Sequence, residues 1–369
     1  MKTLMLAAGL MMIGTNLYAA ENQPYVKDMD GKDYFPLGVN YAWRDWGVDF
    51  SDQGWAERFV KIQADLDLMK AKGVRTLRWW IYTDFVASPL WEGEGTQRRC
   101  VGMPPGWVKN FTATVEAAKA RGIRLYPVFS SFDLGRKGFK EVVSDKSVRK
   151  SFIEKAVRPI LEATGKNGGV FAWDIINEPE WLVRHEDGGD PNKELTNGPV
   201  SLAELRDYIT AMAKEVHARA KQPVSVGSAG LKWCGWQFDF YSGLGLDFFD
   251  AHYYDWMTPW FDITTIPKSS LGQKNPEYGL KPMIVGESMG QPETQYTGKN
   301  KPLNHFTFLR DLIKMGYSGY LAWAWNERPE GDCSKSIDNH LNQALKELKL
   351  PGQAAPEESA TVPAAAPAK

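Results

Sequence analysis

The chain has 369 residues and a formal net charge of −1 at pH 7, which gives no electrostatic reason to expect nucleic acid or an anionic membrane as a partner. Its length suits two domains or one large α/β barrel. Aromatic residues make up 12% of the chain and 15 of them are tryptophans, so either the cores use tryptophan heavily or the protein binds sugar rings, which stack on indoles.

The first twenty residues, "MKTLMLAAGLMMIGTNLYAA", have the pattern of a secretory signal. Lys2 supplies a positive start, residues 4–13 are apolar, and the small residues Ala19 and Ala20 end the segment. The apolar run is too short to span a bilayer, and no other run reaches the ~20 apolar residues that a span needs. We therefore expect a signal peptide at 1–20, a secreted or periplasmic protein, and no membrane insertion. The cleavage point stays open.

Strand-like and helix-like patterns alternate through residues 24–349. Trp55, Phe59, Ile62, Leu66 and Met69 are spaced to form one apolar face of a helix, which Gly73 should end. Further helices are expected at 106–121, 146–164, 201–220, 302–315 and 337–347. Strands are expected at 35–43, 74–82, 123–132, 169–179, 223–230, 246–254, 281–288 and 318–327.

Eight strand-then-helix units predict an α/β fold of the (β/α)8 TIM-barrel type. The strands are continuous apolar runs, as is typical of parallel strands buried on both faces. A doubly wound open sheet is the alternative, and it has less support because no GxGxxG turn follows the first strand. Residues 350–369 are rich in Ala and Pro and are expected to form a disordered tail after the catalytic domain, 24–349.

In a barrel of this type, chemistry takes place at the C-terminal ends of the strands. Two carboxylates are expected there, Glu178 after the fourth strand and Glu287 on the seventh. Such a pair suits hydrolysis of a glycosidic bond, in which one carboxyl protonates the leaving oxygen and the other attacks the sugar or activates water. The gap between them, which decides between retention and inversion, stays open. The other polar or aromatic residues at strand ends are Asn40, Arg78, Ser130, Ser131, Asp133, Asn177, His252, Tyr254, Trp325 and Asn326.

These neighbours have expected roles. Arg78 should pair with Glu287 and lower its pKa, unless it is only a structural ion-pair partner. Tyr254 should donate a hydrogen bond to the same carboxylate. Asn177 should hold a sugar hydroxyl, and Trp325 should form the floor of the subsite. His252 is either part of the site or a buried structural imidazole.

Five segments in order carry a resemblance to a known family. "RWW", "NEP", "AHYY", "IVGES" and "LAWAWN" resemble glycoside hydrolases of clan A, and in particular family 5, the cellulase and β-mannanase family. The resemblance covers about 35–345. It implies a retaining mechanism with Glu178 as acid/base and Glu287 as nucleophile. It also implies a substrate subsite formed by Arg78, Asn177, His252, Tyr254 and Trp325. Asn40 is added to this subsite because it lies at the end of the first strand.

One departure bears on the substrate. Many family 5 enzymes carry a histidine at the end of the third strand, where this chain has "YPVFSSFD". The sugar therefore stays open among β-glucan, β-mannan and other polysaccharides. Long loops that carry Trp91, Trp256, Trp260 and Phe261 either form the walls of a cleft or pack against each other.

The function expected from these features is a secreted retaining glycoside hydrolase that acts on a polysaccharide or oligosaccharide. One alternative is a non-catalytic carbohydrate-binding barrel. A second alternative, an enzyme that acts on phosphorylated metabolites, has less support because no Gly-rich phosphate loop follows the seventh strand. No motif implies a cofactor or a metal, and we expect a monomer. Isolated Cys100, Cys234 and Cys333 suggest packing residues, although one pair is able to bond in an oxidising compartment.

Overall fold

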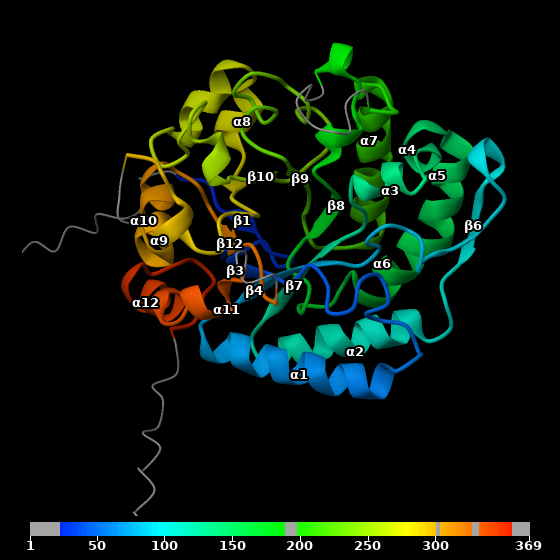
Figure 1. Ribbon diagram of the computed structural model, residues 1–369, viewed down its shortest axis with the longest axis horizontal. Coiled ribbons are helices and arrows are strands. Elements are labelled where there is room, and N and C mark those ends of the chain that lie inside the picture. The colour runs from blue at the N-terminus through cyan, green and yellow to red at the C-terminus, as the bar shows by residue number, and fades with distance from the viewer. Residues whose placement is uncertain (1–22, 189–197, 300–302, 327–331, 356–369) are drawn as a thin grey trace, which may run out of the picture.

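The computed structural model describes residues 23–188, 198–299, 303–326 and 332–355. Strands run through its centre and helices surround them (Figure 1). The predicted signal peptide lies outside the described residues. The eight strands of the main sheet are β3 (Leu37–Asn40), β4 (Thr76–Trp80), β7 (Arg124–Val128), β8 (Trp173–Asn177), β9 (Val224–Ser228), β10 (Phe249–Ala251), β11 (Met283–Ile284) and β12 (Tyr320–Ala322).

The main sheet closes into a barrel. Its strand order is β11-β10-β9-β8-β7-β4-β3-β12, and every pairing is parallel. A parallel bridge between Val285 and Tyr320 joins the two ends of this order. Closure confirms the predicted (β/α)8 class and excludes the doubly wound open sheet. The remaining strands form two small antiparallel pairs, β1 (Val26–Lys27) with β2 (Asp33–Tyr34) and β5 (Leu90–Glu92) with β6 (Arg99–Gly102).

The helices around the barrel follow the predicted periodicity. In α1, Ile62, Leu66 and Met69 are fully buried, whereas Trp55 and Phe59 stack on each other at the rim. The longer helices are α1 (Trp55–Ala71), α2 (Trp107–Lys119), α5 (Lys146–Phe152), α6 (Arg158–Thr164), α7 (Leu202–Arg219), α10 (His305–Lys314) and α12 (His340–Glu347). The short ones are α3 (Asp133–Arg136), α4 (Glu141–Ser144), α8 (Pro276–Leu280), α9 (Pro292–Gln295) and α11 (Cys333–Ser336). Short 3₁₀-helices are η1 (Gly95–Gln97), η3 (Pro179–Leu182), η4 (His185–Asp187), η5 (Asp255–Met257) and η6 (Lys268–Gln273).

Two local breaks in the helices have sequence causes. The helix expected at 146–164 is interrupted by a π-helical stretch, η2 (Ile153–Val157), just before Pro159, which has no N–H to donate to the preceding turn. Gly73 ends the segment after α1 with a φ of 88°, and a Cβ at this position would meet the backbone of Asn342. Glycine is therefore required there both for its conformation and for its size.

The fifth and sixth units differ from the prediction of eight strand-then-helix units. Neither β9 nor β10 is followed by a long helix in the described residues; the chain after β10 forms η5, η6 and the five-residue α8. In Figure 1 the segment near α8 consists of short helical turns joined by loops, whereas the longer helices α1, α2 and α7 cover other sides of the barrel.

The tail begins later than predicted. Leu350 is 6% exposed and packs in the main core, and the Phe35 N–H donates to the Pro351 carbonyl at 2.9 Å. The Gln353 amide returns a hydrogen bond to the Phe35 carbonyl at 2.5 Å. Residues 350–353 thus belong to the folded domain, and 356–369 lie outside the described residues.

Three further features bear on the sequence-based expectations. Cys100, Cys234 and Cys333 are all buried and unbonded, as packing residues would be. No helix in the described part of the chain is long and apolar enough to cross a membrane. The closed end of the barrel is filled by an aromatic cluster that includes Tyr34, Tyr126, Phe171 and Phe248. This packing leaves the C-terminal ends of the strands as the open end.

Candidate active site

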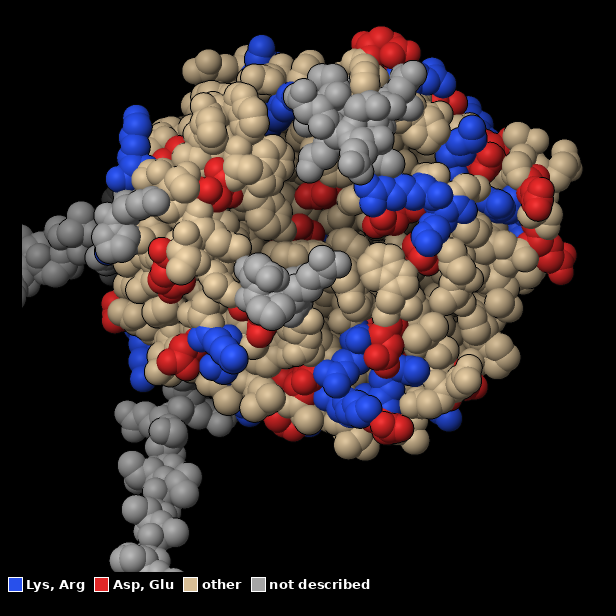
Figure 2. Space-filling model, viewed as in Figure 1, with Lys and Arg blue, Asp and Glu red and all other residues tan. Residues whose placement is uncertain are grey.

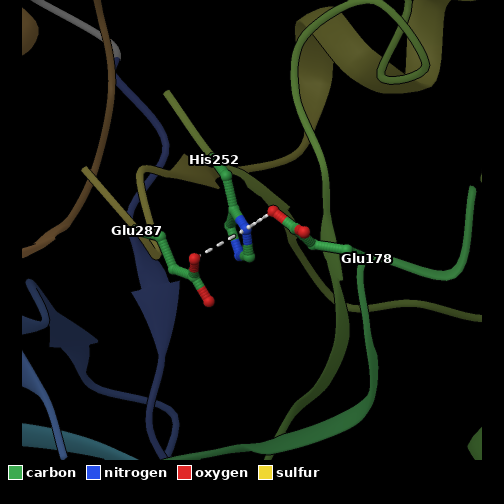
Figure 3. A group of neighbouring side chains, drawn as sticks. All are labelled: Glu178, His252 and Glu287. Atoms are coloured by element: carbon green, nitrogen blue, oxygen red, sulfur yellow. Dashed lines mark hydrogen bonds and ion pairs between the residues drawn. The ribbon is translucent and has the colours of Figure 1, made fainter. Parts of the chain in front are cut away.

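The two predicted carboxylates meet at the mouth of the barrel. Glu178 follows β8 and Glu287 lies three residues beyond β11. One oxygen of each carboxylate and one ring nitrogen of His252 lie within 4.8 Å of one another (Figure 3). Figure 2 shows a hollow near the centre of this face, with acidic side chains on its floor. Two residues 109 positions apart in the chain are thus side by side, within reach of one small group bound between them.

Glu178 is held in a strained turn by two hydrogen-bond partners. Its φ of 46° is left-handed, which is uncommon for a residue other than glycine, and the one-turn η3 begins directly after it. The Trp181 Nε1–H donates to its Oε2 at 2.7 Å, and His252 Nδ1 lies 2.9 Å from its Oε1. Burial raises the pKa of Glu178, but the contacts with His252 and Trp181 and the charge of Arg78 outweigh it and bring the pKa below its ordinary value.

Glu287 is held by three groups. Arg78 Nη1 donates to its Oε1 at 2.6 Å, Tyr254 Oη donates to its Oε2 at 2.7 Å, and His252 Nδ1 lies 3.3 Å from Oε2. The expected contacts of Arg78 and Tyr254 are therefore present. Arg78 lowers the pKa of Glu287 as expected, but burial and the charge of Glu178 outweigh Arg78, His252 and Tyr254, so the pKa of Glu287 lies above its ordinary value.

Arg78 is the centre of a buried polar network beneath the two glutamates. Its guanidinium is 0% exposed and also donates to Asp174 Oδ2 at 3.0 and 2.8 Å, to Asn40 Oδ1 at 3.0 Å and to Asn177 Oδ1 at 2.8 Å. Five donated hydrogen bonds fix the plane of the guanidinium. Arg78 is therefore both an ion-pair partner of Glu287 and the structural centre of the site.

Asp174 is the residue of this network that the sequence analysis missed. It lies inside β8 rather than at its end, and it is fully buried. The signal was a charged residue within the apolar run "FAWDIIN", since a carboxylate at such a position needs a buried cation to compensate for its desolvation. Arg78 is that cation.

The chain was compared with known proteins. No family model matches it. A mannan endo-1,4-beta-mannosidase of Cryptopygus antarcticus is 22% identical over 346 residues, which cover 86% of this chain and 87% of that protein. One of Mytilus edulis is 22% identical over 356 residues, covering 86% and 88%. The crystal structure of the beta-1,4-D-mannanase from Cryptopygus antarcticus superimposes with a TM-score of 0.72 at 18% identity, covering 90% of this chain and 98% of that chain.

This chain is a glycoside hydrolase. The similarity to the mannosidases covers 86% of this chain, and the paired glutamates lie at the strand ends where the family resemblance placed them.

In this hydrolase the two asparagines differ in what they offer to a ligand. Asn40 donates to the Gly286 carbonyl at 2.8 Å and accepts from Arg78, so its amide is fully used by the protein. Asn177 accepts from Arg78, and no hydrogen bond from its Nδ2 is found within the described residues. Asn177 is therefore able to donate to a sugar hydroxyl, whereas Asn40 acts by positioning Arg78.

The aromatic surface at the mouth of the hydrolase is formed by a different tryptophan from the expected one. Trp325 is 4% exposed and packs in the main core, so it has no free face for a sugar. Trp323 is partly exposed and lies 5.6 Å from Trp80 and 6.2 Å from Trp43, measured between ring centroids. The Trp323 N–H also donates to the carbonyl of Ser288, next to Glu287, at 2.8 Å. The alternation of "LAWAWN" allowed either tryptophan to face the mouth, and the backbone turn after β12 decides it.

The loop aromatics divide into two groups. Trp256 and Trp260 are 45% and 65% exposed and form an edge-to-face pair. Phe261 is buried, and Trp91 packs among Phe85, Phe139 and Phe152. Trp256 and Trp260 are therefore the most exposed of these four aromatics.

The serine side chains at the end of the third strand make hydrogen bonds to the protein itself. The Ser130 hydroxyl donates to the Ile175 carbonyl at 2.9 Å, and Ser131 donates to Asp133 at 3.0 Å. The serines that stand where many family members have histidine thus support β8 and its neighbouring turn.

The carboxylates and imidazole are also ligand types that divalent metals accept. Arg78 donates directly into Glu287, which places a guanidinium beside any cation that this carboxylate would bind. The expectation of a metal-free enzyme stays a prediction.

Proposed function

We propose that this chain is a retaining, endo-acting β-mannanase that cleaves β-1,4-linked mannan. The observation that carries the proposal is the separation of the two carboxylates, with oxygens within 4.8 Å of each other. Retaining glycosidases hold their carboxyl groups about 5–5.5 Å apart, and inverting enzymes need about 6.5–9.5 Å to admit a water molecule. The names of the two similar proteins support mannan as the substrate.

In the first step, a Glu287 oxygen attacks the anomeric carbon while Glu178 gives its proton to the glycosidic oxygen. The bond between that carbon and the oxygen breaks, the leaving chain departs as an alcohol, and a glycosyl ester forms on Glu287. In the second step, Glu178 takes a proton from water, the resulting hydroxide attacks the anomeric carbon, and the Glu287 carboxylate is released. Each step inverts the configuration at the anomeric carbon, so the product retains the configuration of the substrate.

His252 supplies a second place for the catalytic proton. Burial lowers the pKa of its imidazole, but the carboxylates of Glu287 and Glu178 raise it above the ordinary value. His252 and Glu178 therefore share one proton across 2.9 Å, either as an imidazolium beside a carboxylate or as a neutral pair with the proton on Glu178. The neutral pair is the form that protonates the leaving oxygen.

Arg78 and Tyr254 stabilise Glu287 as a nucleophile and as a leaving group. Burial and the charge of Glu287 raise the pKa of Tyr254, so the phenol keeps its proton and remains a donor. The hydrogen bonds from both donors become stronger as negative charge returns to Glu287 in the second step. We assign Asn177 to a sugar hydroxyl, and Trp323 rather than Trp325 to the face of the sugar ring. Asn40 and His252 act through Arg78 and the two glutamates.

The remaining expectations form part of the proposal. The protein is exported through residues 1–20, and it acts as a monomer. Determining the first residue of the exported protein, and its mass in solution, tests both points.

The roles of the glutamates are tested by Glu287→Ala, Glu178→Ala and, as a control, Glu57→Ala, whose side chain is 78% exposed. We expect Glu287→Ala to abolish turnover of mannan and azide to restore cleavage with inverted product, as read from the anomeric NMR signals. Glu178→Ala should lose about 10²–10⁴-fold on mannan but little on substrates whose leaving group needs no proton.

A panel of mannan, β-1,4-glucan and mixed-linkage glucan tests the substrate. Cleavage of mannan at internal bonds supports the proposal, and cleavage of glucan alone would replace mannan by another polysaccharide. Binding without cleavage of any of them would favour the non-catalytic barrel.

A further inference from the structure

A pocket lies on the flank of the barrel where long helices are missing. It has a volume of about 410 Å³ and is formed by the loop after β9 together with the segment between β10 and α8. Its walls include Trp236, Thr265, Pro267, Ser270, Gln273 and Lys274. None of the residues around the two glutamates lines it. The pocket is therefore a separate feature of this chain, created by the two loops that replace helices.

The chemistry of the lining is that of a carbohydrate site. Trp236 is 36% exposed and presents an indole to the pocket. In the part of the chain that the structure describes, no hydrogen bond is found for the Trp236 Nε1–H or for the side chains of Gln273 and Lys274. These groups provide one apolar face with donors and an amide acceptor at its edge, the combination that ligand sites use to hold a ring and fix its orientation.

The hydroxyl groups in the pocket are also able to accept hydrogen bonds from a ligand. Thr265 Oγ1 donates to the Asp262 carbonyl at 2.9 Å, and Ser270 Oγ donates to the Pro267 carbonyl at 2.6 Å. Each hydroxyl oxygen keeps lone pairs for a donor from outside. No carboxylate lines the pocket, and Lys274 is its only charged side chain. A neutral ligand rich in hydroxyl groups fits this lining better than a cation or a purely apolar molecule.

We propose that this pocket is a second carbohydrate-binding site, which holds a neutral β-linked polysaccharide chain away from the catalytic mouth. Trp236 stacks on a sugar ring, and Gln273, Lys274 and the two hydroxyls hold its hydroxyl groups. The site keeps the enzyme on an insoluble or long substrate while the two glutamates cleave it. The choice of mannan as the bound chain rests on the proposed function; the site itself does not.

The chain offers a matched control for Trp236. Phe238 is on the same loop and is 37% exposed, but it does not line the pocket. We would prepare Trp236→Ala, Gln273→Ala and Phe238→Ala, each with and without Glu287→Ala, which prevents digestion of the polysaccharide during binding. Thermal melting of each variant checks that it is folded.

Binding is measured by migration in native gels that contain soluble mannan, β-1,4-glucan or xylan. We expect Trp236→Ala to weaken retention in at least one of these by about tenfold, Gln273→Ala to weaken it less, and Phe238→Ala to leave it unchanged. With active enzyme, Trp236→Ala should slow the hydrolysis of insoluble polysaccharide and leave kcat/KM on short oligosaccharides unchanged.

Unchanged retention of both Trp236→Ala and Gln273→Ala in all three gels would overturn the second site, as would an equal loss for Phe238→Ala. Loss of retention in Trp236→Ala together with no hydrolysis of mannan by the parent enzyme would uphold the second site and overturn the proposed substrate.

Discussion

The Trp181 indole donates to the Oε2 atom of Glu178 at 2.7 Å, from a position only three residues further along the chain. The turn that makes this contact possible is fixed from below by Glu180, which is fully buried and accepts hydrogen bonds from Ser228, Tyr241 and the Ala229 N–H. The segment "NEPEW" thus contains the candidate acid, its hydrogen-bond donor and the anchor for both.

Replacing Trp181 with Phe keeps the ring and removes the donor. A hydrogen bond to a charged group is worth about 1.5–3 kcal/mol, so we expect kcat/KM on mannan to fall about tenfold or more. The pKa of Glu178 should rise, because its ionised form loses a donor, and the pH profile of kcat/KM should move accordingly. Trp233→Phe is the control, since Trp233 packs edge-to-face on Trp181 but donates to the Gly188 carbonyl instead. Equal effects of the two changes would mean that the Trp181 indole acts only through packing.

His252→Gln tests the shared proton. In the wild-type enzyme, the proton needed by the leaving oxygen is lost as pH rises through the titration of the Glu178–His252 pair, and the pKa of His252 lies above its ordinary value. Without the imidazole, Glu178 must hold the proton by itself, and a carboxyl releases it at lower pH than an imidazolium. We expect the alkaline limb of kcat/KM against pH to move to lower pH. An alkaline limb at the same pH in the variant would show that the imidazole does not carry this proton.

Trp323 and Trp325 should have opposite phenotypes. Trp325→Ala empties a buried site and should cost about 3–5 kcal/mol of unfolding free energy, measured with denaturant. Trp323→Ala should leave stability within about 1 kcal/mol or so of wild type, since its face is partly open, and should lower kcat/KM on mannan by about tenfold. If Trp325→Ala instead remained as stable as wild type and lost mainly activity, the sequence-based choice of Trp325 would be restored.

Because the pKa of Glu180 is raised in the folded state, we expect the stability of the protein to depend on pH. Burial raises its pKa from 4.5 to about 7 in the folded state. Its contribution is therefore fully present below pH 4.5 and is lost as pH rises to about 7, because the folded state keeps a proton that the unfolded chain releases. The loss amounts to at most about 3–4 kcal/mol, since each pKa unit is worth about 1.4 kcal/mol.

Glu180→Gln removes this titration. The free energy of unfolding of the wild type, relative to that of Glu180→Gln, should fall between pH 4.5 and 7, as measured by denaturant unfolding at several pH values. Parallel curves for the two proteins over this range would contradict the assignment. The raised pKa values of Asp49 and Asp250 affect both proteins equally and cancel in the comparison.

The sequence by itself determined the barrel and most of the surroundings of the two candidate catalytic glutamates. Parallel strands need apolar runs and their helices need apolar stripes, and both patterns are local, so they could be counted along the chain. The ends of the same apolar runs mark the mouth of the barrel, so the sequence also predicts that Arg78, Tyr254, His252 and the two glutamates lie there.

The tertiary structure alone decided the rest. Whether Trp323 or Trp325 faces the mouth depends on a turn after β12, and the raised pKa of Glu287 depends on burial and on a carboxylate 109 residues away. The pairing of Asp174 with Arg78 and the pocket beside Trp236 likewise join segments that are distant in the chain. Distances and desolvation arise only when such segments meet, and no local pattern contains them.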